Sequence, residues 1–96
     1  MDIEGYVVFL EEQRLSPAGI ATRKRMLQEA DDYIGKSVDE VVADDSEMYN
    51  ALIKLQEVDN PAHTPRQNAL RKYYTFKNGK EFPRLNKYKE SKSLTE

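Results

Sequence analysis

Hydrophobic residues recur at helical spacing in the first segment of the chain. The positions i, i+3, i+4 and i+7 are occupied by Ile3, Tyr6, Val7 and Leu10. This spacing places the four side chains on one face of an α-helix. Charged residues follow the apolar stripe as far as Arg14. The pattern predicts a first helix from Ile3 to Arg14.

A second helix is marked at both of its ends. Ser16 is suited to accept a hydrogen bond from an unpaired N–H of the first turn, and Pro17 suits the first helical position, where no N–H is needed. The helix is expected to end at Ile34, because Gly35 adopts the left-handed C-cap conformation without a Cβ clash. Its expected inner face consists of Ile20, Met26, Leu27, Ala30, Tyr33 and Ile34, and its outer face of Lys24, Arg25, Gln28 and Asp32.

Two further helical segments are predicted in the middle of the chain. Ser37 and Glu40 have the spacing of a capping box, which predicts a short helical piece with Val38, Val41 and Val42 turned inward. A longer helix is expected from Ser46 to Val58, preceded by acidic residues that favour the positive helix N-terminus. Its buried arc is expected to hold Met48, Ala51, Leu52, Leu55 and Val58, and Asn60 with Pro61 stops it.

The last well-marked helix repeats the signals of the second. Thr64 is the expected N-cap, Pro65 the first helical residue and Gly79 the C-cap after Asn78. Its apolar arc holds Ala69, Leu70, Tyr73, Tyr74 and Phe76, and its polar face holds Gln67, Asn68, Arg71, Lys72 and Thr75. No segment has strand periodicity. The fold class predicted is therefore all-α, a compact bundle of four to five helices.

The segment after Gly79 differs from the preceding chain. It has few apolar residues, like charges in sequence and no helical stripe. We expect Phe82, and Leu85 after it, to pack on the bundle before the chain continues as a tail. The predicted organisation is a helical domain over residues 1–79 and a basic linker or tail over residues 80–96.

Composition narrows the class of protein. A chain of 96 residues without cysteine suits one small domain and excludes a disulfide scaffold, a thiolate zinc site and a cysteine nucleophile. The longest apolar run, Tyr6 to Leu10, is far shorter than the roughly 20 residues that span a bilayer. We expect a cytoplasmic protein with no membrane association.

The charges are distributed unevenly along the chain. Residues 1–48 hold 5 basic and 12 acidic residues, whereas residues 49–96 hold 10 basic and 5 acidic residues. Such asymmetry favours a polyanionic partner for the second half. The alternative is that these lysines and arginines are simply solvated.

The polar face of the last well-marked helix is the strongest candidate for a binding surface. Arg, Lys, Asn, Gln and Thr are the side chains that donate to phosphates and reach base edges, and this face contains no acid. Arg71 and Lys72 are expected to face solvent, so that their replacement would leave stability nearly unchanged. The candidate DNA-contacting residues are Lys24, Arg25, Gln28, Asn68, Arg71, Lys72, Thr75, Lys77 and Lys80. An ordinary solvated helix face is the alternative interpretation.

No residue set supports catalysis, a metal site or a cofactor. His63 and Arg66 form a His-x-x-Arg pattern, but no second histidine or nucleophile stands with it, and Pro65 is explained as a helix start. The paired acids Asp31 and Asp32 point about 100° apart on a helix and cannot converge on one atom. We expect a non-catalytic chain with His63 in an exposed loop.

The order of segments resembles the core-binding domain of tyrosine recombinases and phage integrases. The marks of the resemblance are the aromatic first helix, Leu15-Ser16 at the second, and the run from Ala69 to Phe76, with its Ala-Leu-Arg-x-aromatic-aromatic-x-Phe pattern. The chain departs from the family's pattern at Gly19, Arg23 and Ala30. The resemblance implies a SAM-like helix bundle that forms half of a clamp around duplex DNA, with its second and last helices against the duplex.

The same resemblance implies that catalysis and partner contacts involve a second domain. The family's catalytic residues belong to a second domain, so a recombinase catalytic domain or other recombinase subunits are implied partners. Tyr73 and Tyr74 are then core aromatics and not nucleophiles. The alternative function is a helical protein-interaction module, for which the acidic first half and the apolar positions of the first helix would supply the surface.

Overall fold

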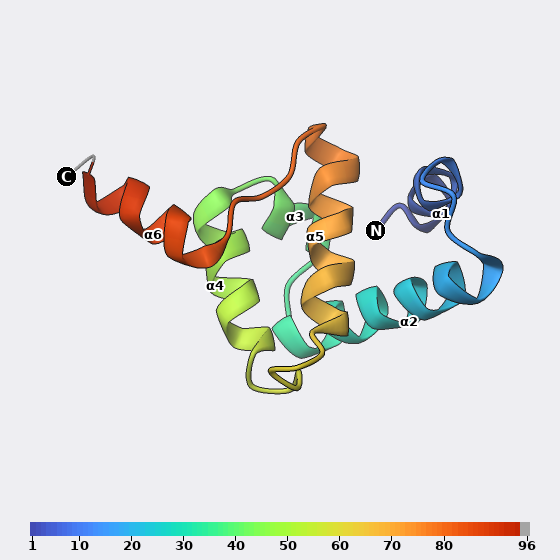
Figure 1. Ribbon diagram of the computed structural model, residues 1–96, viewed down its shortest axis with the longest axis horizontal. Helices are drawn as coiled ribbons and strands as arrows, with labels where there is room; N and C mark the ends of the chain where they lie inside the picture. Colours follow the sequence, from blue (N-terminus) through green and yellow to red (C-terminus); the bar gives the residue numbers. More distant parts are fainter. Residues whose placement is uncertain (95–96) are drawn as a thin grey trace.

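The computed structural model describes the backbone of residues 1–94 and the side chains of residues 1–90. Six helices and no β-strand occur in this part of the chain, which confirms the all-α prediction (Figure 1). The helices are α1 (Ile3–Glu12), α2 (Pro17–Ile34), α3 (Val38–Val42), α4 (Asp45–Leu55), α5 (Pro65–Asn78) and α6 (Leu85–Leu94). Among these described helices, none has the length and apolar character needed to cross a membrane.

The core lies where α2 and α5 pack against each other, with α1, α3 and α4 around them. Fully enclosed side chains come from five helices and include Tyr6, Leu10, Leu27, Val38, Met48, Leu52, Leu55, Leu70 and Tyr73. Each buried leucine contributes about 1.5–3 kcal/mol by removal from water. Helix α1 is fastened to α5 because the Tyr6 hydroxyl donates to the Ala69 carbonyl oxygen at 3.0 Å. The Tyr6 ring also packs edge-on against the Tyr73 ring.

The predicted ends of α2 and α5 are confirmed. The Ser16 hydroxyl oxygen accepts a hydrogen bond from the Gly19 N–H at 3.2 Å. Gly35 and Gly79 have φ angles of +77° and +72°, the left-handed region in which a side chain would be strained. These local signals therefore position both central helices.

Thr64 occupies the N-cap position of α5 as predicted, but the capping hydrogen bonds come from a residue outside the helix. The Thr64 side chain makes no capping hydrogen bond. Asp59 takes the role, because its carboxylate accepts from the backbone N–H of Gln67 at 3.0 Å and of Arg66 at 3.4 Å. A carboxylate is the better cap here, since its charge also faces the positive end of the helix and the Arg66 guanidinium at 3.0 Å.

Tyr33, Val58 and Gln67 differ from the predicted burial. Tyr33 is 38% and Val58 39% exposed, although both were expected on inner faces. Tyr33 lies in the last turn of α2, beyond the core, and its hydroxyl donates to Glu57. Helix α4 ends at Leu55, so Val58 lies in the following turn. Gln67 was expected on the polar face of α5 but is buried. Its side-chain amide donates a hydrogen bond to the buried Asp59 carboxylate, which satisfies the polar group there.

The segment after Gly79 contains a helix that the sequence analysis did not predict. Phe82 is buried as expected, and α6 follows it. The Phe82 ring packs edge-on against Tyr74 and lies 5.2 Å from the Tyr88 ring, which stacks on Tyr49 of α4. The segment has no apolar helical stripe of its own, and these aromatic contacts with residues distant in sequence pack it against the bundle.

Candidate nucleic-acid interface

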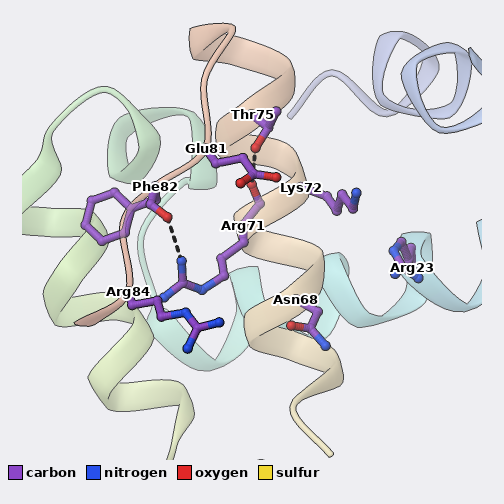
Figure 2. Close-up of a pocket in the computed structure, with 8 residues that line it drawn as sticks. All are labelled: Arg23, Asn68, Arg71, Lys72, Thr75, Glu81, Phe82 and Arg84. Atoms are coloured by element: carbon purple, nitrogen blue, oxygen red, sulfur yellow. Dashed lines mark hydrogen bonds between the residues drawn. The ribbon is translucent and has the colours of Figure 1, made fainter. Parts of the chain in front are cut away.

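A groove runs over the outer face of α5 and has a volume of about 560 Å³. Its walls come from α2, from α5 and from the chain between α5 and α6 (Figure 2). The lining residues are Arg23, Asn68, Arg71, Lys72, Thr75, Glu81, Phe82 and Arg84. We call this surface the α5 groove.

Helical spacing explains the α5 contribution to the groove. Asn68, Arg71, Lys72 and Thr75 follow the i, i+3, i+4, i+7 pattern, so that they share the face opposite to the buried side of α5. The Thr75 hydroxyl donates to the Arg71 carbonyl oxygen at 3.1 Å. All four are among the DNA-contacting residues predicted from the sequence, and the structure brings them together.

Arg71 is held in place by the chain that follows α5. Its Nη1 donates to the carbonyl oxygens of Phe82 at 2.9 Å and Pro83 at 3.2 Å. The guanidinium also lies over the Phe82 ring, 5.8 Å from its centre. Burial lowers the pKa of Arg71, and the nearby charge of Arg84 lowers it further. Arg71 was expected to face solvent, and the structure leaves it only partly exposed.

Lys72 shares the outer face of α5 with Arg71 but projects in a different direction. Its Nζ donates to the Gln13 side-chain oxygen at 2.8 Å, next to the end of α1. Arg71, in contrast, reaches toward the chain between α5 and α6. The α5 groove thus has cations on both sides of its helix, with Asn68 and Thr75 between them (Figure 2).

Arg23 of α2 was not among the predicted site residues, yet it lines the groove. It precedes the buried Met26 and Leu27 by three and four residues, so its stem lies on the packed face of α2. Its Nε is buried without a hydrogen-bond partner within the described residues. The sequence did contain a sign of this position, since Arg23 has the helical spacing of buried residues. A long cationic side chain at such a position buries its aliphatic stem and extends its charged end to the surface.

A second, smaller hollow adjoins the α5 groove at the start of α5. Its volume is about 260 Å³, and Arg23 and Asn68 line both hollows. The other lining residues are Thr22, Met26, Ala62, His63, Thr64 and Pro65. The concave surface therefore continues from the end of α5 to the α4–α5 loop.

Among the described residues, the four cations of the α5 groove have no acidic partner, in contrast to four other cations of the fold. Arg23, Arg71, Lys72 and Arg84 make no ion pair within the part of the chain that the structure describes. Elsewhere, acids neutralise Arg25, Lys36, Arg66 and Lys77. Glu81 is the one acid that lines the groove. The groove consequently carries an excess of positive charge.

The remaining predicted residues lie outside the α5 groove. On α2, Arg25 pairs with Glu29 at 3.8 Å, and Lys24 and Gln28 are not lining residues. Lys77 projects from the other side of α5, where its Nζ is 4.0 Å from Asp39. Lys80 is exposed just beyond the C-cap of α5. Arg84 was missed because its segment was interpreted as a tail.

The His63-x-x-Arg66 pattern does not form a joint site. His63 is exposed, whereas Arg66 pairs with Asp59 at 3.0 Å and Glu29 at 2.9 Å.

Burial raises the pKa of Tyr74 to about 12, with a contribution from its hydrogen bond to Asp45, and burial also raises the pKa of Tyr73. Both tyrosines are core residues that resist ionisation. Residues 1–94 contain no group of three or more His, Asp or Glu side chains placed to hold a metal ion.

Comparison with known proteins adds no relative to this picture. No protein-family model matches the chain, and no match is found among proteins of described function or among solved structures.

Proposed function

We propose that this chain is a non-catalytic DNA-binding module that lays the outer face of α5 against duplex DNA. The observation that carries the proposal is the set of four groove cations without acidic partners. Lys and Arg side chains supply most of the affinity of such modules by neutralising backbone phosphates. The proposal assigns neither cleavage nor joining of DNA to the chain.

The layout of the groove suits a helix that rests on a duplex. Asn68 and Thr75 lie along the middle of the exposed face of α5, and cations lie on both sides of it (Figure 2). Phosphate contacts from the sides would orient the helix, while the amide and hydroxyl groups face the base edges. The proposed contact set is Arg23, Asn68, Arg71, Lys72, Thr75 and Arg84.

The resemblance to the core-binding domain of tyrosine recombinases supports the same orientation. In that family the second and last helices of the bundle lie against DNA, and here Arg23 of α2 joins α5 in one groove. Under this proposal, a recombinase catalytic domain or further recombinase subunits would supply the chemistry.

Titration of a labelled duplex at several salt concentrations tests the proposal. We expect a dissociation constant of about 10⁻⁴–10⁻⁶ M near physiological salt, and binding that weakens steeply as salt rises. Lys72→Ala should reduce the magnitude of the salt slope by about 0.9, the value for one phosphate contact. Lys36→Ala is the matched control, because Lys36 is paired with Glu47 and lies outside the groove.

The second candidate function is a helical protein-interaction module. One observation favours it: Val8 of α1 is 52% exposed, with Glu4 and Glu12 one turn away on either side. An apolar side chain within an acidic stripe fits a basic, partly apolar protein surface. Absence of duplex binding even at low salt would reject the DNA proposal and favour this one.

A further inference from the structure

The Arg71 guanidinium is only partly used by the fold. Both of its hydrogen bonds start from Nη1 and end on backbone carbonyls. Its Nε and Nη2 make no hydrogen bond within the described residues. These two N–H groups form the side-on fork that arginine uses to bind an oxyanion with two hydrogen bonds.

Arg84 is positioned beside Arg71 by its neighbours in sequence. Phe82 anchors the segment because its ring is 4% exposed, and the Phe82 and Pro83 carbonyls are tied to Arg71. The Arg84 carbonyl oxygen then accepts from the Tyr88 N–H at 2.9 Å, the first hydrogen bond of α6. The backbone of Arg84 is thus fixed on both sides, while its side chain is exposed and lines the groove (Figure 2).

The Arg71 and Arg84 side chains line the same groove and lie next to each other (Figure 2). The charge of Arg84 contributes to the lowered pKa of Arg71, after burial. Glu81 acts in the opposite direction but forms no ion pair within the described residues. A bound anion would relieve this repulsion. A phosphate group matches best, since it offers several acceptor oxygens to two arginine forks at once.

We infer that Arg71 and Arg84 together hold one phosphate group, so that the segment between α5 and α6 forms part of the binding site. The inference rests on the proposed function in one respect: the phosphate is taken to belong to the DNA backbone. Free phosphate has the same chemistry, and the experiment below separates the two sources.

The first arm uses inorganic phosphate as the ligand and the full chain labelled with ¹⁵N. Phosphate is added against chloride at constant ionic strength, and the Nε–H signals of the arginines are followed by NMR. We expect the Arg71 signal to shift with saturation and the Arg66 signal to stay in place, because Arg66 is already paired with Asp59 and Glu29. Arg84→Gln should abolish the shift, and Lys87→Gln, an exposed residue outside the groove, should preserve it.

The second arm uses duplex DNA with the same variants. Arg84→Gln should reduce the magnitude of the salt slope by about 0.9, and Lys87→Gln should change it less. If duplex binds and Arg84→Gln keeps the parental slope, this inference is overturned while the proposed function stands. If Arg71 responds to phosphate through Arg84 and no duplex binds at low salt, the site takes free phosphate and the DNA proposal fails. An unresponsive Arg71 signal, or a response unaffected by Arg84→Gln, also overturns the inference.

Discussion

Asp59 performs two tasks with one carboxylate. Its side chain is fully buried and bonds the Arg66 guanidinium at 3.0 Å. The same carboxylate accepts from the backbone N–H groups at the start of α5. A buried charge is tolerated only when it is paired and hydrogen-bonded, and Asp59 meets both conditions. It therefore sets the start of the helix that carries the groove.

Removal of this carboxylate is expected to destabilise the fold. Asp59→Ala leaves Arg66 with one fewer partner and two N–H groups of α5 uncapped, so we expect a loss of about 3 kcal/mol in the free energy of unfolding. Urea denaturation followed by circular dichroism measures it. Asp32→Ala, at an exposed position of α2, should stay within about 0.5 kcal/mol. Equal stability of the two variants would show that Asp59 does not cap α5.

Arg71 illustrates how one residue serves both fold and surface. Its hydrogen bonds to the Phe82 and Pro83 carbonyls tie α5 to the next segment. Replacement of Arg71 is therefore expected to lower stability as well as charge, contrary to the expectation from its place on the polar face. Lys72 bonds only the exposed Gln13 side chain, which makes it the cleaner residue for the DNA titration.

At the scale of elements, α6 depends on the aromatic residues that precede and begin it. Phe82 contacts Tyr74 of α5 and Tyr88 of α6, and Tyr88 stacks on Tyr49 of α4. Edge-on and offset aromatic pairs contribute about 0.5–1.5 kcal/mol each beyond their burial. Phe82 is thus the link between α6 and the core.

Phe82→Ala should consequently destabilise the protein as a core substitution does. Loss of a buried phenylalanine costs about 3–5 kcal/mol, and we expect a value in this range from thermal or urea denaturation. Lys89→Ala, at an exposed position of α6, is the control and should stay within about 0.5 kcal/mol. A Phe82 variant as stable as the control would mean that the segment after Gly79 is not part of the core.

At the scale of the whole molecule, one carboxylate joins the first segment, α3 and α5. The Asp39 side chain accepts hydrogen bonds from the Met1 ammonium at 2.8 Å and from the Tyr73 hydroxyl. These two contacts hold the pKa of Asp39 below its ordinary value. Stabilisation from a carboxyl with a lowered pKa is complete above its unfolded value of about 3.9 and is lost as the pH falls through the lower, folded value.

Asp39→Asn tests this linkage through its pH dependence. The urea midpoint of the variant should lie below that of the parent at pH 7. The two midpoints should converge as the pH falls from about 4, where the unfolded carboxyl becomes protonated, through the lower pKa of the folded state. Glu40→Gln, an exposed neighbour, should show no such convergence. A difference between parent and Asp39→Asn that stays constant from pH 7 to pH 2 would contradict the assignment.

Charge at this scale divides the molecule into two regions. The acids of the first half lie mainly on α1 to α4, where Glu47, Asp39 and Glu29 neutralise nearby cations. The α5 groove keeps four cations and one acid. The sequence had indicated the excess of basic residues in the second half, but which of them lack a partner follows from the packing.

Local signals in the sequence specify helices α1 to α5 and most of their boundaries. Ser16 with Pro17 and the glycines at positions 35 and 79 act on the residues next to them, and apolar periodicity reports the buried side of each helix. Such signals are local, so they can be recognised without knowledge of the fold. They also sufficed to select Asn68, Arg71, Lys72 and Thr75 as residues of one helix face.

The capping contacts of α5, the presence of α6 and the composition of the groove depend on tertiary packing. Arg66 contacts Glu29, 37 residues earlier in the chain, and Tyr88 of α6 stacks on Tyr49 of α4. Arg23 and Arg84 enter the α5 groove from segments on either side of α5 in sequence. Contacts of this kind depend on how helices pack, and no pattern within a single segment encodes them.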